Sequence, residues 1–338
     1  MATTRVILHV GPMKTGTSAI GAYFSAAQRA GILPPDVIYP VQDHWFPSAG
    51  GITKHNQLAD YLFPEGRDKL ARKTPIQTPD SVARKVRDVA AHLAKGRGPR
   101  GTAVFVSEAL IGRADLERLV DLLNSSFDEV VLVLAIRSPV EATQSLLVHR
   151  IKEWRSDHVD FDLYGMLKRP NGSIGYDLRR MLSQLQELPI DKFVLIPYFE
   201  NESDGYAVVD RFMKIVTGKS AIRLEDDFGS RRIHPSLPLS SLKRLAALKK
   251  LKLKFDRIPF LISIIHSLFV RILDVDRSRV MRAGFKTRSS ASGDWVLSPT
   301  ERAKVIGLYG NLGADLRKAL GNQSTQAEWR SWFETTGL

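Results

Sequence analysis

The chain has 338 residues, 49 lysines and arginines against 36 aspartates and glutamates, a formal net charge of +13, 43% hydrophobic residues and no cysteine. The length and hydrophobic content allow a large core and exclude a disordered chain, while the lack of cysteine excludes a disulfide scaffold, a thiol nucleophile, a zinc–thiolate site and an iron–sulfur cluster. The basic surplus favours anionic partners, such as nucleotides, polyanionic glycans, nucleic acid or an anionic membrane.

Short apolar runs alternate with longer helical patterns along the first two thirds of the chain. Four runs lack the polar alternation of a strand with one solvated face and predict buried parallel strands, at residues 6–10, 103–106, 130–136 and 193–196. Helical patterns occur at residues 17–29, 81–95, 114–123, 140–153 and 176–188. This alternation predicts an α/β fold with a doubly wound, mostly parallel sheet that binds ligands at the carboxyl ends of its strands.

The pattern changes after about residue 225. Linker-like sequence lies at residues 34–51, 96–101 and 228–241. We expect one domain, with a core at about 1–225 and a helical and loop elaboration at about 226–338 that returns to it.

Neither a signal peptide nor a membrane-spanning helix is predicted. The first apolar stretch is short and is followed at once by Gly11 and Pro12, as expected of a buried strand that enters a turn. The apolar run at residues 258–270 is too short to cross a bilayer and contains His266. We therefore expect a cytosolic protein, with a peripheral contact at the inner membrane surface as an open alternative.

The first predicted strand and helix are joined by a glycine-containing loop that reads Gly11-Pro-Met-Lys-Thr-Gly-Thr-Ser18. In this context, backbone N–H groups and a helix N-terminus bind phosphate. The two glycines have the spacing of a Walker A motif, but Thr17 occupies the position of the Walker lysine, and the lysine is Lys14. The loop therefore suits a ligand with one phosphate-like group and no β/γ pair to bridge.

A second set of polar residues follows the strand predicted at residues 130–136. Arg137-Ser138-Pro139 ends this strand, and the following helix has Ser145 eight residues after the arginine. An arginine can contact a phosphate with two hydrogen bonds, Pro139 can begin the helix and Ser145 adds a hydroxyl donor. Because the carboxyl ends of parallel strands share one sheet edge, the two sites can hold two phosphates of one ligand.

The two segments together resemble the sulfotransferases that use 3′-phosphoadenosine-5′-phosphosulfate, whose loop reads Lys-x-Gly-Thr-Thr or close to it. The resemblance covers roughly residues 3–30 and 103–200 and implies a P-loop-like sulfotransferase fold. It also implies sulfuryl transfer to a hydroxyl or amine, with Lys14 stabilising the bridging oxygen of the leaving phosphate and no obligatory metal. The donor contacts it implies are Lys14, Thr15, Gly16, Thr17, Ser18, Arg137 and Ser145.

The reaction needs a base for the acceptor proton, and the family commonly places a His or Glu near the end of a neighbouring strand. Glu108 follows the strand predicted at 103–106 and is our first candidate, although it could instead be a carboxylate at a helix N-terminus. His55 is the second candidate, with a surface or capping histidine as its alternative. His44, beside Trp45 and Phe46, is a candidate for the acceptor pocket.

Two later segments leave alternatives open. Lys286 and Arg288 lie in a basic segment similar to the loop that closes over the 3′-phosphate in many sulfotransferases, but the usual Arg-Lys-Gly start is absent, so a solvated basic turn is the alternative. Residues 243–257 are strongly basic, and the apolar run 258–270 follows. Together they form either a membrane-surface element or, as we favour, a helix pair packed on the core.

Two other functions compete with sulfuryl transfer. A P-loop nucleotide kinase would share the fold, but it should have a Walker lysine and a magnesium-binding carboxylate. A non-catalytic binder of nucleic acid or glycans would explain the charge, but no nucleic-acid-binding motif is found, so we expect no nucleic-acid partner. The acceptor expected from the resemblance is a carbohydrate or glycolipid, because the Lys-Thr-His strand end of the small-phenol enzymes is Val106-Ser107-Glu108 here.

Overall fold

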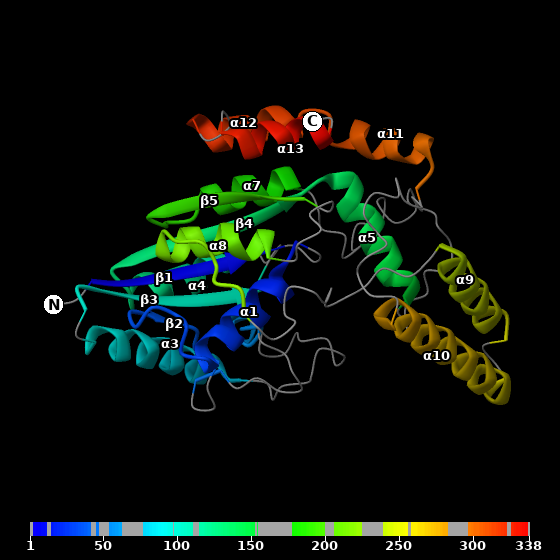
Figure 1. Cartoon of the computed structure of the whole chain (residues 1–338), viewed down its shortest axis with the longest axis horizontal. Helices are drawn as coiled ribbons and strands as arrows, with labels where there is room; N and C mark the ends of the chain where they lie inside the picture. The colour runs from blue at the N-terminus through cyan, green and yellow to red at the C-terminus, as the bar shows by residue number, and fades with distance from the viewer. Residues whose placement is uncertain are drawn as a thin grey trace.

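The computed structural model of the protein describes residues 3–11, 15–41, 45–46, 54–62, 77–96, 98–110, 115–152, 154, 178–199, 206–224, 239–255, 258–282, 297–322 and 326–336. Its strands form one parallel five-stranded sheet in the order β2-β3-β1-β4-β5 (Figure 1). The strands are β1 (Thr3–Val10), β2 (Val37–Ile38), β3 (Arg100–Ser107), β4 (Glu129–Arg137) and β5 (Lys192–Tyr198).

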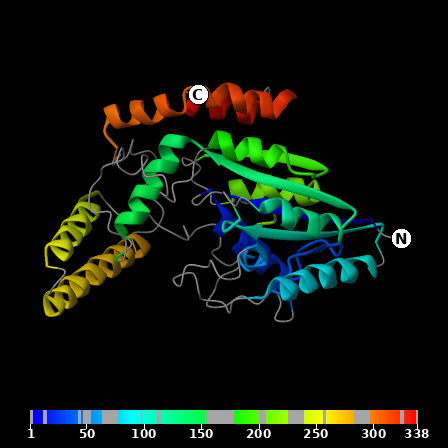
Figure 2. The same cartoon turned by 180° about the vertical axis from the view of Figure 1, so that it is seen from behind.

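The central strands are apolar on both faces because both faces are covered by helices. Ile7 packs with α1 (Thr17–Arg29) and α8 (Ala207–Thr217) on one face. Leu8 packs on the other face, which is covered by α3 (Pro79–Ala94), α4 (Leu116–Asn124) and α7 (Leu178–Gln186) (Figures 1 and 2). Short α2 (Leu58–Leu62) packs against α3 and α4. The predicted doubly wound α/β fold is confirmed.

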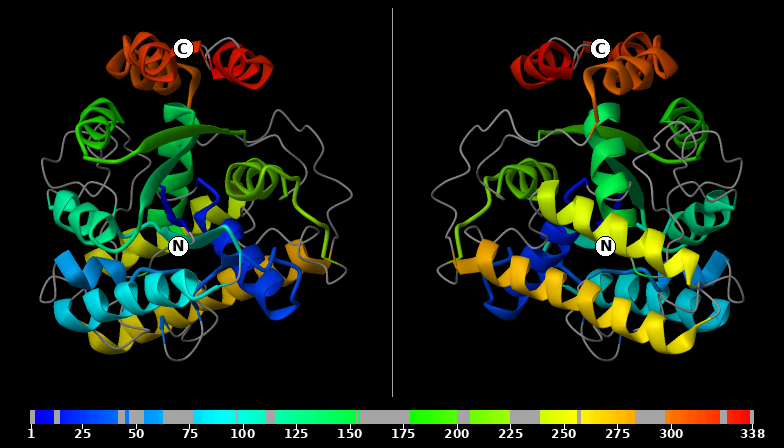
Figure 3. Two further views of the ribbon diagram at one scale, coloured as in Figure 1. Left: turned by 90° about the vertical axis from the view of Figure 1, so that its left-hand side faces the viewer. Right: turned by 90° about the vertical axis from the view of Figure 1, so that its right-hand side faces the viewer.

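The C-terminal third is helical where it is described. It consists of α9 (Leu239–Lys254), α10 (Pro259–Arg282), α11 (Pro299–Leu308), α12 (Leu312–Leu320) and α13 (Ala327–Thr336). α9 and α10 pack against each other, and α9 contacts α5 (Pro139–Lys152). α12 and α13 lie along the β5 edge of the sheet (Figure 3). Ser298 and Glu301 form a reciprocal capping box at the start of α11.

One strand differs from the sequence expectation. β2 lies within the segment at 34–51 that has linker-like composition, and its two residues pair with Thr102 and Ala103 of β3. A strand of two residues is too short for a periodic pattern, and Pro34 and Pro40 close to it give the segment the composition of a loop. In the described part of the chain, no helix is both long and apolar enough to cross a membrane.

Candidate functional site

The two segments predicted to bind phosphate flank the point at which the connections of the sheet diverge. α1 leaves β1 toward β2, whereas α5 leaves β4 toward β5 on the opposite side. β1 and β4 are neighbours, with Val10 opposite Leu134. Ligands of open α/β sheets bind in the crevice at such a switch point, outside the carboxyl ends of the strands.

The described part of the first loop is tightly packed around Gly11. A Cβ atom at Gly11 would lie 2.7 Å from His9 Cε1, from Thr15 Oγ1 and from Thr17 Oγ1, so only glycine fits without rearrangement. The buried hydroxyl of Thr17 has no hydrogen-bond partner among the described residues. Thr15 is fully buried and Ser18 is partly buried. The loop therefore presents an unsatisfied hydroxyl at the start of α1.

Helix α1 begins with backbone groups that a ligand can use. Gly16 is its N-cap residue, has a left-handed backbone with a φ of 85° and provides no side chain to cap the first turn. The N–H groups of a first helical turn have no partners within the helix and attract anions. Lys14, the predicted catalytic residue of this loop, lies outside the described residues.

His9 is a buried polar residue beneath this loop that the sequence analysis did not single out. Its side chain is fully buried in β1 and packs edge-on against Phe212 of α8, with 5.4 Å between the ring centroids. Burial lowers the pKa of His9 to about 3, so the ring is neutral near pH 7. Neither ring nitrogen has a hydrogen-bond partner among the described residues.

Arg137 ends β4 and is almost fully buried, with 6% of its surface exposed. Its Nε lies 3.7 Å from a carboxylate oxygen of Glu141, in the first turn of α5, and its guanidinium carbon lies 5.4 Å from the centre of the Tyr198 ring. Ser145 is half-buried one further turn along the same helix face as Glu141. The structure thus places the predicted arginine at the end of β4 and the predicted serine in the second turn of the helix that follows it.

Tyr198 joins the two predicted phosphate sites. A Cβ atom at Gly16 would lie 3.3 Å from Tyr198 Cε2, and the same tyrosine ring contacts the guanidinium of Arg137. Tyr198 is the last residue of β5 and is paired in register with Arg137. The loop after β1 and the end of β4 therefore meet at a residue that no sequence motif indicated.

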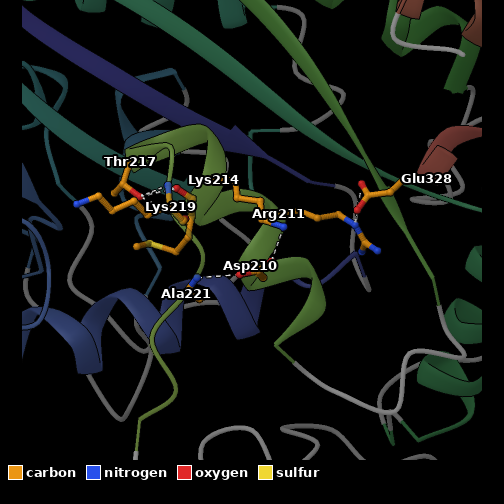
Figure 4. Close-up of polar contacts among 8 residues, drawn as sticks. Asp210, Arg211, Lys214, Thr217, Lys219, Ala221 and Glu328 are labelled. Atoms are coloured by element: carbon orange, nitrogen blue, oxygen red, sulfur yellow. Dashed lines mark hydrogen bonds and ion pairs between the residues drawn. The ribbon is translucent and has the colours of Figure 1, made fainter. Parts of the chain in front are cut away.

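A pocket of about 470 Å³ opens beside this contact. Its lining includes Glu141, Tyr198, Phe199, Arg211, Glu328 and Trp332. Arg211 of α8 lies 3.3 Å from a carboxylate oxygen of Glu328 of α13 (Figure 4). Its guanidinium group also lies over the ring of Phe199. The C-terminal helix α13 thus forms one wall of a pocket whose lining also includes Glu141 and Tyr198, the two residues that contact Arg137.

The two base candidates have different environments. Glu108 follows β3 and is partly exposed, and its carboxylate lies 2.6 Å from the ammonium group of Lys54. His55 is fully buried against Tyr39 and Phe105, and its Nδ1 accepts a hydrogen bond of 3.1 Å from the backbone N–H of Val106. Burial lowers the pKa of His55 to about 3. This placement favours Glu108 over His55.

The positions of the other predicted site residues are not described by the structure. His44, Lys286 and Arg288 lie outside the described residues, whereas the neighbours of His44, Trp45 and Phe46, pack in the core. Within the described ranges, no group of three or more histidine, aspartate and glutamate side chains is arranged to hold a metal ion.

Comparison with known proteins finds similarity among solved structures. No protein-family model matches the chain, and no curated protein matches it. Among solved structures, a crystal structure of a sulfotransferase from Alicyclobacillus acidocaldarius is similar to this chain with 16% sequence identity and a TM-score of 0.39. The similarity covers 78% of this chain and 97% of the other.

Proposed function

We propose that the protein is a sulfotransferase that moves a sulfuryl group from 3′-phosphoadenosine-5′-phosphosulfate to a hydroxyl or amine of a carbohydrate or glycolipid acceptor. The observation that supports this most is the meeting, at Tyr198, of the two segments that the sequence predicts to bind anions. The start of α1 lies against one part of this ring, and Arg137 lies over it at the sheet's switch point. The donor has a phosphosulfate on the 5′ oxygen of its ribose and a phosphate on the 3′ oxygen, so it needs two such segments.

The described residues fit this donor. The 5′-phosphosulfate suits the loop that packs closely around Gly11, with its unsatisfied Thr17 hydroxyl, and the first turn of α1. Arg137, with Ser145 in the second turn of the following helix α5, suits the 3′-phosphate. The pocket beside Arg137 has aromatic walls from Tyr198, Phe199 and Trp332, which suit a nucleoside.

The proposed reaction breaks the bond between sulfur and the bridging oxygen of the donor's 5′-phosphate and forms a bond between sulfur and the acceptor atom. Lys14 would neutralise the charge that develops on the leaving phosphate. Glu108, oriented by Lys54, would accept the acceptor's proton. Catalysis would then consist of positioning and charge neutralisation, as in phosphoryl transfer.

A thermal-shift experiment tests this function. The product 3′,5′-adenosine bisphosphate should stabilise the full chain in the absence of magnesium, and more strongly than ATP with or without magnesium. At about 100 times its Kd, a ligand adds about 2.7 kcal/mol of stability, which raises the Tm of a chain of this size by about 4 °C. A response only to ATP with magnesium would instead indicate a nucleotide kinase, and no response to either nucleotide would refute a nucleotide-dependent enzyme.

A further inference from the structure

The outer surface of the α9–α10 helix pair is unusually apolar. The inner sides of the two helices pack on the protein through buried residues such as Leu245 of α9 and Phe269 of α10. Among the exposed large hydrophobic side chains of the described residues, all but Ile222 and Ile306 belong to this helix pair or directly precede α10. They are Leu251, Leu253, Ile258, Phe260, Ile264, Leu268 and Val270.

The apolar side chains of α10 form a continuous stripe. Phe260, Ile264 and Leu268 are spaced by four residues and therefore lie on one side of the helix, and Phe260 is 73% exposed. Residues 259–270 contain no aspartate, glutamate, lysine or arginine. Such a stripe on a solvent-exposed helix is costly in water and indicates a surface that binds a partner.

The two serines beside this stripe have hydroxyl groups that are hydrogen-bonded within the helix. Ser263 and Ser267 are exposed, but each hydroxyl donates a hydrogen bond to the backbone carbonyl four residues earlier, with distances of 3.2 Å to Pro259 and 3.0 Å to Ser263. A hydroxyl that is satisfied within its own helix needs no water as acceptor. The outer face of α10 can therefore enter an apolar environment without leaving these donors unpaired.

The partner helix supplies positive charge. α9 contains six lysines and arginines and no acidic residue, and Lys243, Arg244 and Lys254 are exposed on it. An apolar stripe next to a uniformly basic helix matches an anionic lipid surface, where side chains such as Phe260 enter the acyl boundary and lysines contact the headgroups. A second copy of the chain is a poorer match, because a two-fold interface would bring two basic α9 helices together.

The helix pair also has a favourable position in the fold. Figures 1 and 2 show α9 and α10 on the side of the molecule toward which the strands run, next to α5. We propose that the outer face of the α9–α10 pair binds the surface of anionic membranes without crossing them. This surface is independent of the sulfuryl-transfer proposal, because none of its residues belongs to the candidate site.

The absence of cysteine allows a direct test in the full chain. Phe260→Cys, labelled with a polarity-sensitive fluorophore, should shift to shorter wavelength with vesicles of phosphatidylcholine containing about 30% phosphatidylserine, and much less with phosphatidylcholine alone. Raising the salt concentration from about 0.1 to 0.5 M should weaken the shift, because screening reduces surface electrostatics. Ile306→Cys, labelled in the same way, is the matched control and should not respond.

Two sets of variants separate the apolar and the basic contributions in vesicle co-sedimentation. Phe260→Ser with Leu268→Ser, and Lys243→Gln with Arg244→Gln and Lys254→Gln, should each reduce binding to the anionic vesicles by about tenfold or more. The controls Ile222→Ser with Ile306→Ser, and Lys95→Gln with Lys219→Gln and Lys318→Gln, remove comparable groups elsewhere and should bind like the parent chain.

Three results would overturn the proposal. The first is equal binding by the parent chain and both α9–α10 variants. The second is no binding of the parent chain to anionic vesicles. The third is a concentration-dependent dimer in sedimentation analysis that Phe260→Ser with Leu268→Ser converts to a monomer, which would assign the face to a second copy.

Discussion

The guanidinium group of Arg137 lies between a carboxylate and an aromatic ring. Glu141 is 3.7 Å from its Nε, and the Tyr198 ring centre is 5.4 Å from its guanidinium carbon. The carboxylate holds the arginine at the strand edge but repels a phosphate that approaches the same group. The strength of the proposed 3′-phosphate site is therefore set by the balance of these two residues.

Substitutions of this pair should change nucleotide affinity in opposite directions. Arg137→Ala should weaken binding of 3′,5′-adenosine bisphosphate by about tenfold or more, because a charged hydrogen-bonding partner worth about 1.5 to 3 kcal/mol is lost. Glu141→Gln should strengthen binding several-fold, since it removes a nearby negative charge. Isothermal titration calorimetry measures both effects, and the exposed Glu187→Gln is the control. Unchanged affinity in Arg137→Ala would contradict the assignment.

At the scale of secondary-structure elements, the start of α1 depends on one backbone conformation. Gly16 has a φ of 85°, and a Cβ atom there would lie only 2.8 Å from Val208 Cγ1 of α8. Gly31, just after the same helix, has a φ of 66° but no atom within 4 Å of its Cβ position. The two glycines therefore share a left-handed backbone and differ in what surrounds it.

This pair of glycines gives a matched prediction. Gly31→Ala should cost about 1 to 2 kcal/mol of unfolding free energy from the left-handed backbone alone. Gly16→Ala should cost more, because the methyl group also meets Val208, and it alone should impair binding of 3′,5′-adenosine bisphosphate. Urea unfolding measures the stability of both variants. Equal losses of stability would show that the α1–α8 contact relaxes easily.

The elements that could be predicted from the sequence are those with a strong local pattern. β4 was predicted because its run from Val130 to Ile136 is apolar at every position, as a strand buried on both faces requires. β2 was not predicted, because a strand of two residues is too short to show a periodic pattern of hydrophobic residues. The sequence left two interpretations of the apolar run in α10 open, a membrane-surface element and a helix packed on the core, since the run is compatible with both.

The candidate site was predictable only in part, for a related reason. The loop before α1 and the end of β4 are local motifs, so their residue types and spacing indicate a phosphate ligand. Tyr198, Arg211 and Trp332 come from β5, α8 and α13, and only tertiary packing brings them to one pocket. The burial of His55 is likewise set by the aromatic residues around it and not by its polar neighbours in sequence.

At the scale of the whole molecule, two buried histidines make stability depend on pH. The pKa values of His9 and His55 are lowered by burial from 6.5 to about 3 in the folded protein. Between these values the unfolded chain binds protons that the folded chain does not, so stability falls as the pH is lowered from about 6.5 toward 3. Each histidine contributes a slope of about 1.4 kcal/mol per pH unit in this window.

Removal of one of these histidines should reduce this slope. His9→Leu should lower the pH dependence of the unfolding free energy between about pH 4 and 5.5 by about 1.4 kcal/mol per unit, because the unfolded variant takes up one proton fewer. Urea unfolding at several pH values gives the slope. An unchanged slope in His9→Leu would show that His9 is protonated in the folded state.

The order of the strands also determines when the chain can fold during its synthesis. β1 is the central strand, yet it is made first and ends at Val10. Of its two partners, β3 begins only at Arg100 and β4 ends at Arg137. At roughly 5 to 20 residues per second, a ribosome needs about 5 to 25 s to add these partners after β1. For that time, a strand that is apolar on both faces has nothing to pair with. The sheet of a nascent chain can therefore close around β1 only after β3 and β4 have been synthesised.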